Sequence, residues 1–204
     1  GFHMAVKGEA EGIRIIHRAM DLGVTFFDSA HKYHNGGSDE VYGKALTGGR
    51  RQKIILMSKA HLRDKASAMK QLEETLKRMN TDYLDLWQCH EVAKHEEVDK
   101  IFAPGGSLEA FVLAKKQGKV RHIALSEAGP ETIRRAAKVA PITALQSEYS
   151  LWTRDPEAGV LAACRRSIEH HAHELVAIHR RELRDQSIEG HLCHVTNSRW
   201  NRRH

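Results

Sequence analysis

Short apolar runs alternate with longer amphipathic segments along most of this chain. Five of the apolar runs have the length and composition of β-strands: Val24–Phe27, Ile54–Ser58, Tyr83–Gln88, Val120–Leu125 and Ile142–Gln146. Each of them is bounded by polar or glycine-containing loops. Strands that are apolar along their whole length and alternate with helices predict a parallel sheet covered on both faces.

The segments between these strands carry apolar residues at helical spacing. The expected helices are a first one from near Glu9 to Gly23, then Ser38–Leu46, Ser67–Met79, Ser107–Lys116, Pro130–Val139 and Pro156–Arg166. Ser38 is a suitable N-cap, and Pro130 suits the first helical turn, where its missing N–H costs nothing. A closed (β/α)8 barrel needs eight strands and about 250 residues. Five strands therefore predict an incomplete, TIM-barrel-like (β/α)8 fold over residues 1–166.

The pattern changes at Ser167. The segment 167–204 is rich in arginine and histidine, and its histidines are His170, His171, His173, His179, His191, His194 and His204. A loose apolar stripe at Leu175, Ile178 and Leu183 predicts a helix within 168–183, and no strand is expected after it. We interpret 167–204 as an atypical tail, and a frameshifted or recombined coding sequence would produce such a segment.

Composition narrows the class of protein. With 41% apolar and 28% charged residues, the chain has the composition of a globular domain, and no apolar run reaches the roughly 18 residues that span a bilayer. Three cysteines, none at CxxC spacing, and no visible secretory signal favour the cytoplasm. The formal charge of +6 raises the alternative of a nucleic-acid-binding module. Lysines and arginines that alternate with acidic residues along the helices favour solvated helix faces instead.

Four ionisable residues stand where apolar strands give way to loops. Asp28 and Tyr33 follow the first expected strand, Lys59 follows the second and His90 follows the third. The carboxyl ends of parallel strands open on one face, so these side chains should lie together there. An ammonium next to a phenol favours the phenolate, and a carboxylate keeps that ammonium charged. Such a group suits general-acid catalysis on a carbonyl, with His90 donating a hydrogen bond to its oxygen.

Several ordered motifs resemble the aldo-keto reductase superfamily. They are Phe26–Tyr33, Ser38–Leu46, Met57–Lys59, Asp82–His90, Gly118–Ser126 and Gln146–Asp155. The resemblance covers about residues 11–166. The segment 60–119 resembles one branch of the family and 125–157 another, which suggests a chimeric origin.

The resemblance implies an NADPH-dependent oxidoreductase that reduces aldehydes or ketones to alcohols. Tyr33 would then be the general acid, Lys59 the residue that tunes it, Asp28 the partner of Lys59, and His90 the residue that orients the carbonyl. Two further family positions, which hold the nicotinamide carboxamide, correspond to Ser126 and Gln146. Glu127 stands where the family often has asparagine.

Alternatives remain open at this point. Asp28 and Lys59 also suit a buried structural ion pair, and Ser126 and Gln146 suit simple strand-end capping. The chain would in that case be a non-catalytic, truncated fragment that binds NADPH weakly or not at all. His173-Glu174 begins like a zinc-binding HExxH, but residue 177 is alanine, so no metal site is expected. An incomplete sheet exposes its edges, which predicts a homo-oligomer. The expected partner is otherwise a small carbonyl substrate.

Overall fold

The computed structural model describes residues 8–168 and 175–179, which form two compact units. The first unit contains residues 8–90 and 99–123. The second contains residues 91–98, 124–168 and 175–179. Two elements contribute residues to both units: helix α4 (His95–Phe102) and strand β4 (Val120–Ser126).

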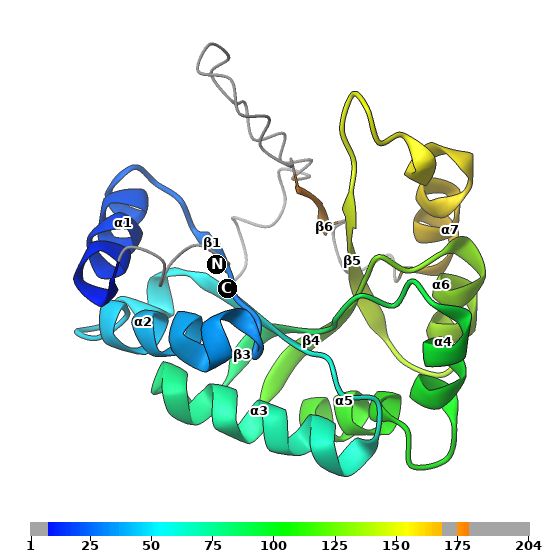
Figure 1. The fold of residues 1–204 in the computed structure, drawn as a ribbon, viewed down its shortest axis with the longest axis horizontal. Helices are drawn as coiled ribbons and strands as arrows, with labels where there is room; N and C mark the ends of the chain where they lie inside the picture. The colour runs from blue at the N-terminus through cyan, green and yellow to red at the C-terminus, as the bar shows by residue number, and fades with distance from the viewer. Residues whose placement is uncertain (1–7, 169–174, 180–204) are drawn as a thin grey trace. The chain divides into compact units, whose positions relative to one another are not determined.

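The first unit is a parallel sheet whose strand order follows the chain. Its strands are β1 (Phe26–Asp28), β2 (Ile55–Ala60), β3 (Leu84–Cys89) and then the first half of β4. β1 pairs with β2, and β2 with β3, both in parallel. The helices of this unit are α1 (Glu9–Asp21), α2 (Gly37–Ala45), α3 (Lys65–Met79) and α5 (Ser107–Lys116), with 3-10 turns at Tyr33–Gly36 and Arg51–Lys53. Each helix packs against the next, as Figure 1 shows.

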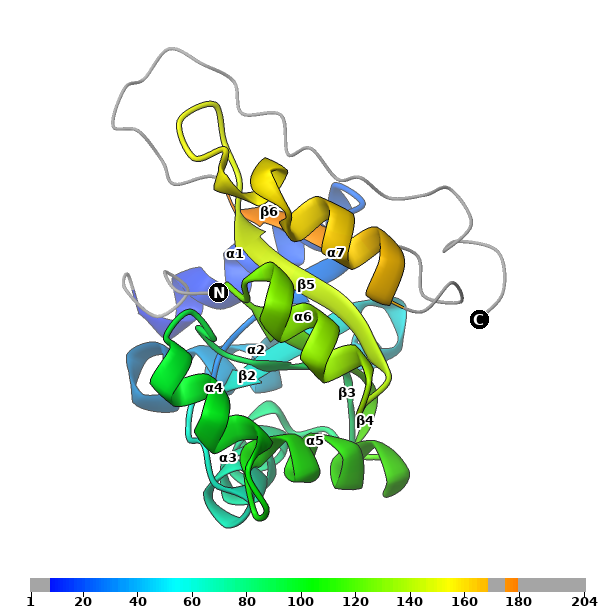
Figure 2. The ribbon, with the colours of Figure 1, turned by 90° about the vertical axis from the view of Figure 1, so that its right-hand side faces the viewer.

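The second unit continues the same alternation. β5 (Ile142–Glu148) follows the second half of β4 and pairs in parallel with β6 (Leu175–His179). Helices α6 (Pro130–Ala137) and α7 (Val160–Ser167) pack side by side (Figure 2), and a 3-10 turn at Asp155–Ala158 precedes α7.

The core of the first unit explains why its strands are apolar throughout. All six residues of β3 are buried, because helices cover the sheet. Trp87 of β3 stacks on Phe111 of α5, with ring centroids 3.9 Å apart. Leu72 and Leu76 of α3 are also buried, and they lie four positions apart, as expected for one face of a helix. Burial of apolar side chains on both faces of the sheet therefore stabilises this unit.

Helices α2 and α3 approach each other at a glycine, and this contact gives a first prediction. A Cβ atom on Gly43 would lie 2.2 Å from the backbone oxygen of Arg78. Because that neighbour is backbone, the helices would have to separate, so Gly43→Ala should lower the free energy of unfolding by about 2–3 kcal/mol. Urea denaturation measures this loss. Gly129→Ala is the control, since no atom lies within 4 Å of its added Cβ. Equal stability of the two variants would contradict the close approach.

The fold class expected from the sequence is confirmed, with corrections at three elements. The N-cap expected at Ser38 is wrong, because α2 begins at Gly37 with Gly36 as its N-cap, and the buried Ser38 hydroxyl lies 3.0 Å from the Ser29 hydroxyl instead. All five expected strands are present, and their ends differ from the expected ones by at most two residues. The helix expected within 168–183 is wrong at Leu175–His179, which form β6. A five-residue apolar run with β-branched residues is too short for its period to distinguish strand from helix, and pairing with β5 decides it. Helix α4 was not expected, because its charged surface hid the spacing of Val98 and Ile101.

Candidate active site

Three neighbouring strands of the first unit deliver the four ionisable residues. Asp28 is the last residue of β1, Lys59 is the next-to-last of β2, and His90 follows β3 directly. Tyr33 begins the 3-10 turn five residues after β1 ends. The backbone continues the sheet beyond the strands, since His31 N–H donates to Lys59 O and His90 N–H donates to Ala60 O. Parallel pairing in this register therefore brings the four residues to one edge of the sheet.

Lys59 is the centre of the cluster. Its side chain is only 2% exposed, and its ammonium donates to the Asp28 carboxylate and to the backbone oxygen of Ser29 at 2.9 Å. Burial lowers the pKa of Lys59 below its ordinary value, and the Asp28 carboxylate opposes that shift. The ion pair thus keeps a buried amine able to carry charge. A buried ammonium in contact with a carboxylate and a phenol suits proton chemistry.

Tyr33 and His90 complete the group. The Lys59 ammonium lies 3.4 Å from the Tyr33 hydroxyl oxygen and 5.0 Å from the centre of its ring. The Tyr33 ring meets the His90 ring edge-on, with centroids 5.8 Å apart. The backbone oxygen of His90 accepts a hydrogen bond from the Arg63 guanidinium at 2.8 Å, which fixes the end of β3. A phenol, an ammonium, a carboxylate and an imidazole therefore share one small region.

A tight reversal of the chain sets the position of Tyr33. His34 and Asn35 have φ of 51° and 54°, and Gly36 follows with φ of 97°. Two non-glycine residues in the left-handed region are uncommon and require support from their surroundings. A Cβ atom on Gly36 would lie 2.5 Å from Cζ of Arg78, so the glycine also allows the guanidinium to approach. The turn that presents Tyr33 is thus held against α3.

The sequence analysis did not identify Ser29, Asp39 and Thr75, which form the hydrogen bonds that lead to Lys59. Ser29, whose backbone oxygen accepts from Lys59, also uses its hydroxyl, which donates to the Asp39 carboxylate at 2.6 Å. Asp39 is fully buried and accepts a second hydrogen bond from the Thr75 hydroxyl at 2.9 Å. One signal was available: Asp39 and Thr75 both lie at helical spacing from the apolar residues of their helices, Tyr42 and Leu72. Polar residues on an apolar face are buried, and buried polar groups need partners.

The three residues expected to contact a cofactor belong to the second unit. Ser126, the last residue of β4, is 4% exposed, and its backbone oxygen accepts from Val92 N–H at 2.7 Å. Gln146 lies in β5 and is half-buried, and its backbone oxygen accepts from Glu127 N–H at 2.8 Å. The Glu127 carboxylate accepts from the Ser147 hydroxyl and from Glu148 N–H with its two oxygens. Glu127 therefore joins the ends of β4 and β5.

A hydroxyl and a primary amide fit one end of a nicotinamide. The carboxamide of that ring offers one oxygen acceptor and two N–H donors, and both Ser126 and Gln146 can donate and accept. Glu127 already uses both oxygens within the unit. The donor set at the ends of β4 and β5 thus suits a carboxamide.

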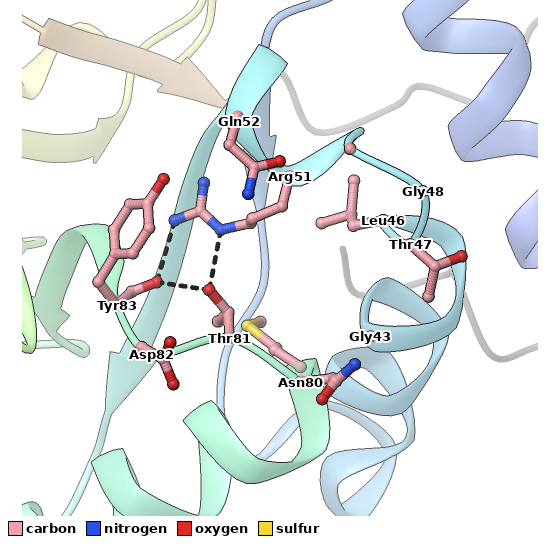
Figure 3. A pocket seen from close by; sticks show the side chains of 12 residues that line it. Gly43, Leu46, Thr47, Gly48, Arg51, Gln52, Asn80, Thr81, Asp82 and Tyr83 are labelled. Atoms are coloured by element: carbon pink, nitrogen blue, oxygen red, sulfur yellow. Dashed lines mark hydrogen bonds between the residues drawn. The ribbon is translucent and has the colours of Figure 1, made fainter.

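A separate hollow lies at the opposite ends of the strands in the first unit. It measures about 250 Å³ and is lined by the end of α2, the loop before β2, the end of α3 and the loop before β3. Figure 3 shows the Arg51 guanidinium donating to the Thr81 hydroxyl and to the backbone oxygen of Tyr83. Arg51 also pairs with buried Asp85 at 2.8 Å. None of the four ionisable residues lines this hollow, and its arginine is committed to structural bonds.

The described residues do not contain a cluster of metal-ligating side chains. Across residues 8–168 and 175–179 no group of three or more His, Cys, Asp or Glu side chains could hold an ion. His170, His173 and Glu174, which begin like a zinc motif, lie outside the described residues. Within the same ranges no helix is long and apolar enough to cross a membrane.

The fold and the four ionisable residues together indicate a class of protein. Parallel strands alternate with helices, and successive strand ends carry a carboxylate, a phenol, an ammonium and an imidazole. This arrangement is typical of an enzyme built on a (β/α) barrel. The family model "Aldo/keto reductase family" matches residues 5–182. This chain belongs to the aldo-keto reductase family.

Relatives and solved structures agree with that assignment. A "Probable aldo-keto reductase 1" from Glycine max is 38% identical over 168 residues, which cover 77% of this chain and 47% of that protein. The holo form of an aldo-keto reductase from Bacillus halodurans matches with a TM-score of 0.70 and 27% identity, over 91% of this chain and 64% of that one. An aldo-keto reductase from Klebsiella pneumoniae, solved with NADP and acetate, matches with a TM-score of 0.66 and 26% identity, over 78% of this chain and 56% of that one.

Two facts about extent follow from these matches. The chain spans about half the length of the curated relative and less than two thirds of these solved chains. The family match covers residues 5–182 and so extends past about residue 166, where the resemblance seen in the sequence ends. The strand β6 lies inside that match and continues the alternation of strands and helices.

Proposed function

We propose that this protein is an NADPH-dependent reductase of aldehydes or ketones, with Tyr33 as the general acid. The single observation that carries the proposal is the Asp28–Lys59–Tyr33 chain of contacts, in which a buried ammonium lies between a carboxylate and a phenol. Membership of the aldo-keto reductase family supports the same reaction class.

Each residue has a distinct role in this proposal. NADPH supplies the hydride that adds to the carbonyl carbon. Tyr33 donates its hydroxyl proton to the carbonyl oxygen, so that hydride and proton together give the alcohol. The positive charge of Lys59 stabilises the phenolate that remains, and Asp28 keeps Lys59 charged. His90 donates a hydrogen bond to the carbonyl oxygen and stabilises the negative charge that develops on it.

We assign cofactor binding to the ends of β4 and β5. Ser126 and Gln146 would hold the carboxamide of the nicotinamide, and Glu127 would keep the two strand ends together. An aldo-keto reductase from Klebsiella pneumoniae is solved with NADP and acetate in one structure and with NADPH in another, which supports NADPH as the cofactor here. Association of copies through sheet edges, the cytoplasmic location and the boundary near residue 166 remain predictions from the sequence.

Cofactor binding provides the second prediction. Gln146→Ala removes an amide that both donates and accepts, so the Kd for NADPH should rise about tenfold, the equivalent of about 1.4 kcal/mol. Titration of NADPH fluorescence measures it. Gln117→Ala, which removes an exposed glutamine at the end of α5, should leave the Kd unchanged. An unchanged Kd in Gln146→Ala would remove that residue from the cofactor site. Absence of NADPH binding by the wild type would favour the alternative, a non-catalytic chain.

A further inference from the structure

We propose that Asp39 is a positioning residue of the active site, which acts through Ser29 to hold the Lys59 ammonium toward Tyr33. The inference rests on the proposed function for its catalytic meaning. Asp39 touches neither Tyr33 nor Lys59 through a hydrogen bond of its own. Its influence passes through one intermediate residue and through its charge.

The contacts form a continuous path from helix α3 to Lys59. The Thr75 hydroxyl of α3 donates to one oxygen of Asp39 at 2.9 Å, and the Ser29 hydroxyl donates to the other at 2.6 Å. The backbone oxygen of Ser29 then accepts from the Lys59 ammonium at 2.9 Å. Ser29 N–H donates to Met57 O at 2.9 Å, so both the backbone and the side chain of Ser29 are fixed. Its carbonyl therefore has one direction, which is toward Lys59.

The loop between Asp28 and Tyr33 has a second attachment to the same helix. The His31 side chain lies 2.7 Å from the Glu74 carboxylate, and its other ring nitrogen lies 3.2 Å from the Gln71 amide nitrogen. Gln71, Glu74 and Thr75 lie three and four positions apart, which places them on one face of α3. That face thus supports the loop at both Ser29 and His31. Ser29 contacts the Lys59 ammonium, whereas His31 contacts only the Lys59 backbone oxygen, through its N–H.

Burial strengthens the electrostatic effect of the Asp39 carboxylate on Lys59. Asp39 is fully buried, and burial raises its pKa, while the Ser29 and Thr75 hydroxyls oppose this by donating to the charged form. The charges of His31 and Arg78 lower the pKa of Asp39. The Asp39 carboxylate in turn raises the pKa of Tyr42 and of Lys59. Among these, the positive charge of Lys59 is favoured by Asp39 as well as by Asp28. A charge in a dry interior acts over a longer range than one in water.

The direct test follows the protonation of Lys59 and needs no enzyme activity. Lysine labelled with 13C and 15N is titrated by NMR in the cofactor-free protein, and the Lys59 signal is assigned by its absence from Lys59→Met. Asp39→Asn should lower the pH at which Lys59 loses its proton. Ser29→Ala, which removes only the hydroxyl link, should lower it less. Asp85→Asn is the matched control and should leave the Lys59 midpoint unchanged, because Asp85 is also a buried carboxylate but pairs with Arg51 and Arg121 instead.

The outcomes separate the inference from the proposed function. A Lys59 midpoint that stays at the wild-type pH in Asp39→Asn and in Ser29→Ala overturns the inference, even if the enzyme is active. If the wild type reduces carbonyls, Asp39→Asn should lower kcat about tenfold and leave the KM for the carbonyl and the Kd for NADPH unchanged. If Asp39 had only a structural role, Asp39→Asn would lower the amount of folded protein. The pH midpoint of Lys59 in the protein that remains folded would then stay at the wild-type value. Failure of the wild type to turn over would count against the proposed function and leave the NMR result to decide on Asp39.

Discussion

Replacing Tyr33 by phenylalanine should abolish most of the carbonyl reduction while leaving the protein folded and able to bind NADPH. The substitution removes one hydroxyl, and general-acid catalysis contributes about 10²- to 10⁴-fold to a rate. We therefore expect kcat to fall by that factor. The hydroxyl lies 3.4 Å from the Lys59 ammonium, a long contact, so its loss should change thermal stability little. Stopped-flow or steady-state oxidation of NADPH with a reactive aldehyde measures the rate.

A second tyrosine serves as the control for this experiment. Tyr83 lies at the opposite ends of the strands, where its ring is 4.0 Å from the guanidinium carbon of Arg51 and 4.2 Å from that of Arg121. Tyr83→Phe keeps the ring and both of these contacts, so it should retain the wild-type rate. Equal rates for Tyr33→Phe and the wild type would remove Tyr33 from the role of general acid.

Replacing Asp28 by asparagine should affect both stability and activity. The variant leaves the Lys59 ammonium, 2% exposed, without the carboxylate that compensates it. Breaking a buried ion pair from one side costs about 3–5 kcal/mol, and the 21% exposure of the Asp28 side chain reduces this to about 2–3 kcal/mol. Activity should fall together with stability, because Lys59 would lose its proton more readily and no longer favour the phenolate.

The pH dependence of that deficit has a definite sign. Loss of Asp28 lowers the pKa of Lys59 in the folded protein further below its unfolded value. Between those two values the unfolded chain binds more protons than the folded one, so stability rises with pH. The variant enters this window at a lower pH than the wild type does. Its deficit should therefore be largest at pH values below the lowered pKa of Lys59 and shrink as the pH rises through that pKa, as urea denaturation at several pH values can measure.

A double variant checks the origin of the effect. Asp28→Asn combined with Lys59→Met removes the uncompensated charge and keeps an apolar side chain of similar length. It should be more stable than Asp28→Asn alone, because replacing both members of a buried pair is often neutral. A double variant as unstable as the sum of the two single ones would mean that the ion pair is not the source of the deficit.

Most of the site could be predicted because it follows from strand ends. An apolar run that gives way to Asp28, Lys59 or His90 marks the carboxyl end of a buried strand, and parallel pairing brings such ends together. That inference needs only hydrophobic pattern and topology. The distances among the four side chains depend on register and on the turn at His34–Gly36, which no local pattern specifies.

The rest of the site depends on burial that a local pattern does not reveal. Asp39 follows the serine expected to cap its helix, so it reads as an ordinary acidic residue of a first turn. The structure buries it completely between Ser29 and Thr75. Strand β6 and helix α4 were missed for a related reason, since short segments contain too few residues for their period to be decisive. Tertiary contacts settle such cases.

Transfer of deuterium tests the central claim most directly. NADPH carrying two deuterium atoms at C4 of the nicotinamide is mixed with the wild type and a reactive aldehyde, and the alcohol is analysed by mass spectrometry. We predict that the wild type forms an alcohol with one deuterium on its carbinol carbon. With Tyr33→Phe the amount of this alcohol should fall to the level measured without enzyme. No deuterated alcohol above that background from the wild type would contradict the proposal that this chain is a carbonyl reductase.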